Sequence, residues 1–275
     1  MLYSGKDLRK LIIPLIIEQI LAIAVGMADT IMVSAAGEAA VSGVSLVDTV
    51  NILLINVFSA LATGGAVVSG HFLGKKKRED ACKSAWQILL FATLLAFVIS
   101  VIFITAHDPL LRLMFGKIED DVMKASKTYL IITTYSFVAL AIYNSCAALF
   151  RAMNESKVTM WVSLLMNVIN VVGNAICIYG LHMGVAGVAI PTTISRYVAA
   201  VVIFLLMFQT KKEINLCGQI TWKFNGSLIK KILYIAIPNG LENSMFQLGK
   251  ILVMSAVATT VSYTHLRAHE TDSYL

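Results

Sequence analysis

Two carboxylates lie inside the first long apolar run of the sequence, which extends from Leu11 to Ser34. Glu18 and Asp29 are eleven residues apart, so a helix would place them on nearly the same face, roughly 16 Å apart along its axis. A carboxylate in hydrocarbon costs on the order of 2.5–3.5 kcal/mol and normally faces a protein interior or a water-filled cavity, where it can bind and release a proton or a cation. With Pro14 predicted to bend the helix, this segment is expected to form the wall of a polar cavity.

Four more polar residues interrupt later apolar runs. Asn167, Asn170 and Asn174 are three and four residues apart and therefore share one helix face. They could contact a ligand or join neighbouring helices through hydrogen bonds. Arg196 is expected to be a buried ion-pair partner, with Glu18 as one candidate, while Glu18 could instead satisfy backbone groups freed by the proline.

The composition is that of a helical membrane protein. Of 275 residues 58% are hydrophobic and 14% charged, and the mean hydropathy is +0.79, whereas about a quarter of the residues of a soluble domain are charged. The four cysteines occur singly, without the spacing of a disulfide framework or a zinc site. We therefore predict an all-α membrane protein with free thiols and no bound metal.

Apolar runs of membrane-spanning length predict seven spans. They cover approximately residues 11–34, 44–73, 84–106, 128–150, 158–179, 188–208 and 229–260. The connections between the spans lie alternately on the two sides of the membrane. Fifteen Lys and Arg residues lie on the side of the amino terminus. Four lie on the other side, and these four are all within 107–127. Because cytoplasmic loops are enriched in Lys and Arg, the amino terminus is predicted to be cytoplasmic. The same bias accounts for the net charge of +6 without a nucleic-acid partner.

A repeat with an offset of 224 residues relates Lys6 to Lys230, Pro14 to Pro238 and Glu18 to Glu242. Six spans separate the two copies, so both enter the membrane from the same side, as in parallel transporter repeats. Glu242 is therefore the candidate site residue of a second bundle.

Several segments together resemble the multidrug and toxic compound extrusion (MATE) family. They are residues 27–32 (MADTIM), 150–157 (FRAMNESK), 170–174 (NVVGN), 178–180 (IYG) and 184–192 (GVAGVAIPT). Since the family has twelve spans in two six-helix bundles, the resemblance implies an amino-terminal bundle (1–208), a cytoplasmic linker (209–228) and the first helix of a second, missing bundle (229–260). Residues 261–275 match nothing in the repeat and are expected to be a foreign or disordered tail.

The resemblance further implies an antiporter in the plasma (inner) membrane, coupled to protons or sodium, that exports organic, often cationic or amphipathic compounds. It would be no enzyme and would need no cofactor besides the coupling ion. Asp29 would belong to the coupling site together with Asn170, whereas Asn174 stands where many members have an acid. The candidate cavity residues are Asp29, Glu18, Asn170, Asn174, Asn167, Thr192 and Arg196.

Other functions fit less well. A lipid-linked oligosaccharide flippase of the related superfamily would share the helix count, but should carry several cations in its cavity, where this chain offers mainly Arg196. A membrane-embedded enzyme would need a catalytic constellation, which the spans lack. The segment 70–76 (GHFLGKK) departs from a phosphate loop in its spacing and lacks the final Ser or Thr, so no nucleotide is expected. His265 and His269, with Glu270 and Asp272 close behind, could form a metal cluster, but neither a strong helix nor a second pair of ligands accompanies them, so no metal site is expected.

Overall fold

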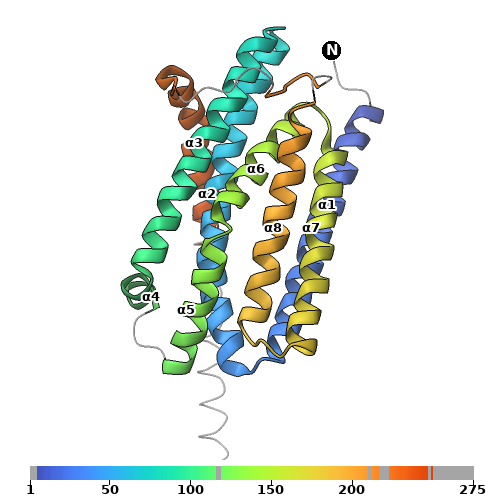
Figure 1. Ribbon diagram of the computed structural model, residues 1–275. Helices are drawn as coiled ribbons and strands as arrows, with labels where there is room; N and C mark the ends of the chain where they lie inside the picture. The colour runs from blue at the N-terminus through green and yellow to red at the C-terminus, as the bar shows by residue number, and fades with distance from the viewer. Residues whose placement is uncertain (1–4, 116–118, 210–211, 217–222, 247–248, 250–275) are drawn as a thin grey trace, which may run out of the picture.

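The computed structural model describes residues 5–115, 119–209, 212–216, 223–246 and 249. The described residues form helices joined by short connections (Figure 1). The helices are α1 (Gly5–Ser34), α2 (Glu38–Gly74), α3 (Arg78–Thr105), α4 (His107–Phe115), α5 (Asp120–Thr134), α6 (Phe137–Ala152), α7 (Ser156–Ala175), the π-helix η1 (Ile176–Gly180), α8 (Ala186–Leu206) and a helix over 226–246. The prediction of an all-α protein is confirmed.

Five helical segments are long and apolar enough to cross a membrane, and α5 with α6 makes a sixth when the two are taken as one broken span. These are the first six predicted spans, each alternating in direction with the one before it (Figure 1). The predicted division into 1–208, 209–228 and 229–260 stays a prediction. The end of the seventh span and the predicted tail 261–275 lie outside the described residues.

The fourth span is broken, which the sequence pattern did not predict. The axes of α5 and α6 differ by 51° at Tyr135 and Ser136. The Ser136 hydroxyl donates a 2.6 Å hydrogen bond to the carbonyl of Thr133, and the Ser136 amide bonds the same carbonyl. Side-chain competition for backbone carbonyls bends helices, and this segment contains neither proline nor glycine to signal the break.

The proline expected to bend the first span does not interrupt it, and neither does a second proline in the sixth span. Helix α1 continues through Pro14 and α8 continues through Pro191. Pro191 instead lies against α7, where a β-carbon added to Gly173 would be 2.6 Å from the proline Cβ. Glycine at this position therefore lets α7 and α8 approach closely, which is how small residues act between membrane helices.

Two other glycines have the same function along α2. A β-carbon on Gly43 would lie 2.7 Å from Ala125 Cβ in α5, and one on Gly65 would lie 2.5 Å from Ile88 in α3. Helix α2 therefore occupies the centre of the bundle, in contact with α3, α5 and α6. Helix α1 instead lies at the edge and packs mainly on α7 (Figure 1).

The segment predicted as a polar linker is partly a packed element. Ile214 and Leu216 are fully buried, and the Leu216 amide bonds the carbonyl of Met207 at 3.0 Å. Arg78 donates hydrogen bonds to the carbonyls of Lys212 and Glu213. This part of the linker is therefore held against the ends of α3 and α8.

The last described helix begins at 226, three residues before the predicted start at 229. The side-chain oxygen of Asn225 caps it by accepting a 3.2 Å hydrogen bond from the Leu228 amide. Gln87 of α3 anchors the same turn, donating to the carbonyl of Lys223 and accepting from the amide of Asn225, both at 2.9 Å. The helix thus lies beside α2 and α3, on the opposite side of the bundle from α1 (Figure 1).

Candidate functional site

Asp29 and Asn174 meet where α1 packs on α7. Asn174 Nδ2 donates a 2.7 Å hydrogen bond to Asp29 Oδ1. The asparagine is fully buried and Asp29 is half-buried. The contact therefore places a titratable carboxyl group at the interior of the bundle, with one amide as its hydrogen-bond donor. Asn174 Oδ1 has no hydrogen-bond partner among the described residues.

The contact continues into α8 through a chain of hydrogen bonds. Asn174 Nδ2 also lies 3.4 Å from Asn170 Oδ1, one helical turn earlier, and Asn170 Nδ2 donates to Thr192 Oγ1 at 2.9 Å. The Thr192 hydroxyl in turn donates to the carbonyl of Val188 at 2.8 Å. Close packing of Gly173 on Pro191 brings α7 and α8 near enough for this chain. The structure thus groups four of the predicted residues, Asp29, Asn170, Asn174 and Thr192.

A second carboxylate, Asp48 of α2, belongs to the same region and was missed in the sequence analysis. Its Oδ1 accepts hydrogen bonds from Asn51 Nδ2 at 3.2 Å and from the Tyr129 hydroxyl at 3.1 Å. Asp29, Asp48 and Tyr129 line one cavity of about 80 Å³, enough for a few water molecules. The role of Asp48 could have been predicted, because it is an acidic residue inside the predicted span 44–73. An intramembrane charge is as costly there as it is at Asp29.

Arg196 supplies a positive charge near both carboxylates. Its Nη1 donates a 2.8 Å hydrogen bond to Ser136 Oγ at the break between α5 and α6. The guanidinium attracts the carboxylates of Asp29 and Asp48, which repel each other. The region therefore combines two acids with one base, and net negative charge remains when both acids are ionised.

Glu18 does not pair with Arg196, so that suggestion was wrong. The carboxylate lies 3.7 Å from Arg151 Nη1 in the last turn of α6, and it accepts a 3.3 Å hydrogen bond from Thr159 Oγ1 of α7. Since Asp29 also bonds a residue of α7, the prediction that the two acids share one helix face is confirmed. They belong to two separate clusters on that face.

The structure shows no hydrogen bond from two further predicted residues to either cluster. Asn167 is buried on α7, one turn from Asn170, but its Nδ2 has no hydrogen-bond partner among the described residues. Glu242 is exposed on the 226–246 helix, and the structure shows no ion pair for it with any described residue.

The donor set suits a proton or a hard cation. Carboxylate, amide and hydroxyl oxygens are the ligands of hard cations such as Mg²⁺ and Ca²⁺, whereas His and Cys suit transition metals. Within the described part of the chain, no group of three or more His, Cys, Asp or Glu residues could hold a metal ion. The arrangement is that of a membrane transporter: a helical bundle with titratable groups clustered around an internal cavity.

The comparisons identify the class more closely. The MatE family model matches residues 14–176, more than half of the sequence, and the chain belongs to this family. It is 28% identical over 250 residues to the uncharacterized transporter YisQ of Bacillus subtilis, covering 89% of this chain and 54% of YisQ. It is 26% identical over 251 residues to the probable multidrug resistance protein NorM of Thermotoga maritima, covering 90% and 53% respectively. The chain thus spans about half the length of these relatives.

Solved structures show the same fold. A MOP superfamily transporter from Pyrococcus furiosus superposes with a TM-score of 0.82 at 22% identity, covering 90% of this chain and 54% of that protein. A crystal structure of MATE in complex with MaD3S gives a TM-score of 0.83 at 22% identity, with 90% and 55% covered. At these identities the likeness concerns the fold.

Proposed function

We propose that this chain forms the amino-terminal half of a cation-coupled antiporter that exports small organic, often cationic compounds across the plasma membrane. The observation that carries the proposal is the buried contact of Asp29 with Asn174, which opens on a cavity shared with Asp48. A carboxylate in this setting can exchange its cation when the cavity changes its access to water. The names of relatives such as the multidrug resistance protein NorM support export of drugs as the task.

The coupling ion is a proton or sodium. When Asp29 and Asp48 are ionised, the site attracts a cation; when one is neutralised, repulsion across the cavity falls and the helices around it can rearrange. Movement of one bundle against the other is the general route to alternating access. The proposal therefore expects that residues 1–275 alone do not raise drug tolerance, because a second bundle must supply the other half.

The test is Asp29→Asn in a full-length transporter containing this chain, expressed in cells without their own exporters. The amide keeps the shape and one oxygen that can accept the bond from Asn174, but it replaces the other oxygen with a donor and cannot titrate, so ethidium efflux should be abolished while membrane insertion is kept. Asp108→Asn is the matched control, because Asp108 is an exposed carboxylate that does not line the cavity; it should export normally. Unimpaired export by Asp29→Asn would exclude the coupling role.

Imposed gradients separate the two ions. In vesicles, export driven by a sodium gradient at constant pH would assign sodium, and export driven by a pH gradient without sodium would assign the proton. Transport that follows neither gradient would contradict cation coupling.

A further inference from the structure

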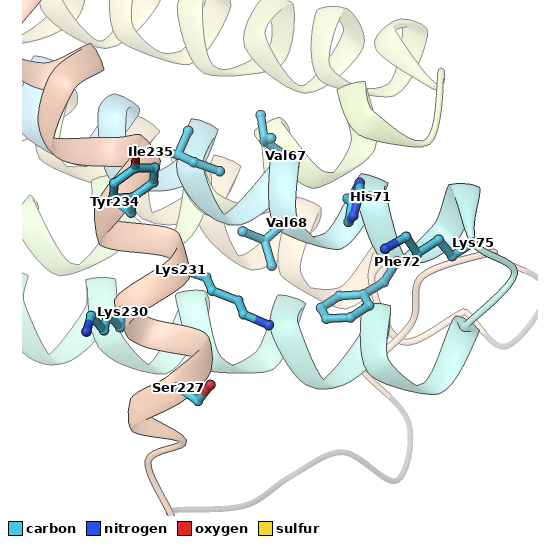
Figure 2. Close-up of a pocket in the computed structure, with 10 residues that line it drawn as sticks. All are labelled: Val67, Val68, His71, Phe72, Lys75, Ser227, Lys230, Lys231, Tyr234 and Ile235. Carbon is cyan, nitrogen blue, oxygen red and sulfur yellow. The ribbon is translucent and has the colours of Figure 1, made fainter.

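A groove of about 580 Å³ lies between the last turns of α2 and the first turns of the 226–246 helix (Figure 2). It lies beside the tight contact of the two helices at Gly64, where an added β-carbon would be 2.6 Å from the carbonyl oxygen of Ile232. From that contact it extends toward the end of α2 at Gly74 and its basic turn. Its volume falls in the range of small-molecule sites, about 300–1,000 Å³.

One end of the groove is basic. Lys75 and Lys231 extend from opposite helices toward the space around Phe72 (Figure 2), and Lys231 Nζ lies 6.0 Å from the centre of the Phe72 ring. His71 lines the same end. None of the described residues lining the groove is acidic, and neither lysine forms a salt bridge with a described residue. The charges of this end are therefore available to an anion.

The other end of the groove is apolar and open to the outside of the bundle. Val67, Ile235 and Tyr234 line it, and Tyr234 is 83% exposed. Val67 is itself 48% exposed. In a bilayer crossed by these helices, the exposed part of this wall would meet acyl chains, and the lysines at the other end of the groove would lie near the headgroups. Tyrosine is enriched at that boundary.

We propose that this groove binds an anionic phospholipid of the leaflet at the α2 carboxyl end, with its phosphate between Lys75 and Lys231 and its first acyl carbons against Val67 and Ile235. Basic pockets between membrane helices bind anionic headgroups in this way. A free phosphate would leave the apolar wall unused, and a zwitterionic lipid would bring its own cation next to the lysines and would not reduce the net positive charge of this end. The groove lies near the carboxyl end of α2, whereas the coupling region around Asp29 lies near the carboxyl end of α1. Because α1 and α2 run in opposite directions, the two sites are at opposite ends of the bundle (Figure 1).

The experiment is lipid competition on the purified 275-residue chain in detergent, read by native mass spectrometry with phosphatidylglycerol and phosphatidylcholine of identical acyl chains. The chain should retain phosphatidylglycerol in preference. Lys75→Gln combined with Lys231→Gln should lower that preference about tenfold, which corresponds to about 1.4 kcal/mol. Circular dichroism and gel filtration check that each variant keeps its helical content and size.

Lys76→Gln combined with Lys77→Gln is the matched control, because it removes the same number of charges next to Lys75, from two residues that do not line the groove. It should keep the preference for phosphatidylglycerol. An equal loss in both double variants would mean general surface attraction and overturn the site. Displacement of the lipid by an equal concentration of glycerol phosphate would overturn the lipid assignment, since the apolar wall would then contribute nothing. Equal retention of both lipids by the unaltered chain would also overturn it.

Discussion

Asn174 donates a 2.7 Å hydrogen bond to the Asp29 carboxylate, and it is the only described residue that gives Asp29 a side-chain hydrogen bond. The bond crosses the interface of α1 and α7, so it joins the helix at the edge of the bundle to the chain of polar residues that leads into α8. Among the described residues, Asp29 therefore depends on one amide for its side-chain hydrogen bond, while Arg196 contributes a more distant positive charge.

Removing that amide should destabilise the protein. Asn174→Leu leaves the Asp29 carboxylate without its donor, and a buried group that loses its partner costs about 1–3 kcal/mol. Asn167→Leu is the matched control on the same helix, because Asn167 Nδ2 has no described partner to lose. Unfolding of both variants by SDS in mixed micelles should show a loss for Asn174→Leu and little change for Asn167→Leu. Equal losses would show that the Asp29 bond adds nothing.

Asp48 and Tyr129 should behave as a coupled pair. Tyr129→Phe removes the 3.1 Å hydrogen bond to Asp48 and should lower the free energy of unfolding by about 1 kcal/mol, as for hydrogen bonds between membrane helices. In a double-mutant cycle with Asp48→Ala, which removes the acceptor, the coupling energy should exceed about 0.5 kcal/mol. Tyr179→Phe, at a 53% exposed residue, is the control and should have little effect. Additive losses in the cycle would contradict the pairing.

Much of the fold follows from the sequence because the length of an apolar run is set by the bilayer. The first six spans were predicted on this ground, with ends that differ from the structure by several residues where helices continue into water. Helix α2, for example, begins at Glu38 instead of Val44. The break at Ser136 was not predictable in the same way, since a hydroxyl bonding a carbonyl leaves no mark on the hydropathy pattern.

The site was predicted in part. Periodicity placed Glu18 and Asp29 on one face, and the family resemblance placed Asp29 near Asn170 and Asn174, as the structure has them. The partner of each acid depends on how far the neighbouring helices are shifted along their axes relative to α1. This shift cannot be read from a single sequence. Arg151 follows directly after the predicted span 128–150 and was not identified as a partner, although it reaches Glu18 from the last turn of α6.

The close contact of α2 with the 226–246 helix should depend on Gly64. Gly64→Ala places a methyl group 2.6 Å from the Ile232 carbonyl oxygen, and such overpacking costs about 1–3 kcal/mol. Oxidative cross-linking between cysteines introduced at Ala60 and Gly240 reports the contact, because a Gly240 β-carbon would lie 3.3 Å from Ala60 Cβ. The cross-linking yield should fall in Gly64→Ala.

Gly70→Ala is the control for this experiment, since its methyl group would meet only Ala152 Cβ at an ordinary 3.9 Å. It should leave the yield unchanged, with the native cysteines replaced in all samples. A yield that is insensitive to Gly64→Ala would show that the two helices do not approach as closely as the structure has them.

The connection between α3 and α5 should be sensitive to acid. Lys127 Nζ donates a 3.1 Å hydrogen bond to Asp108 Oδ2, and this bond, with the lysine charge, lowers the pKa of Asp108. A carboxyl whose pKa is lower in the folded state stabilises that state above its unfolded pKa of about 3.9, and the contribution is lost as the pH falls through the folded pKa. Lys127→Met should raise the pKa of Asp108 in an NMR titration. Lys124→Met, which removes the partner of Asp121 instead, should leave the pKa of Asp108 unchanged.

The charge bias of the loops makes a prediction about orientation that the fold alone does not. The turn at 75–77 and the turn at 153–155 lie at one end of the bundle and α4 lies at the other (Figure 1). Lysine and arginine are concentrated at the first end, so this end should be cytoplasmic.

Alkaline phosphatase, which is active only outside the cytoplasm, should therefore be active when fused after Glu119 and inactive when fused after Lys77. Green fluorescent protein, which folds in the cytoplasm, provides the reciprocal control at the same two positions. The opposite pattern with both reporters would reverse the orientation and place the lysine-lined groove in the outer leaflet.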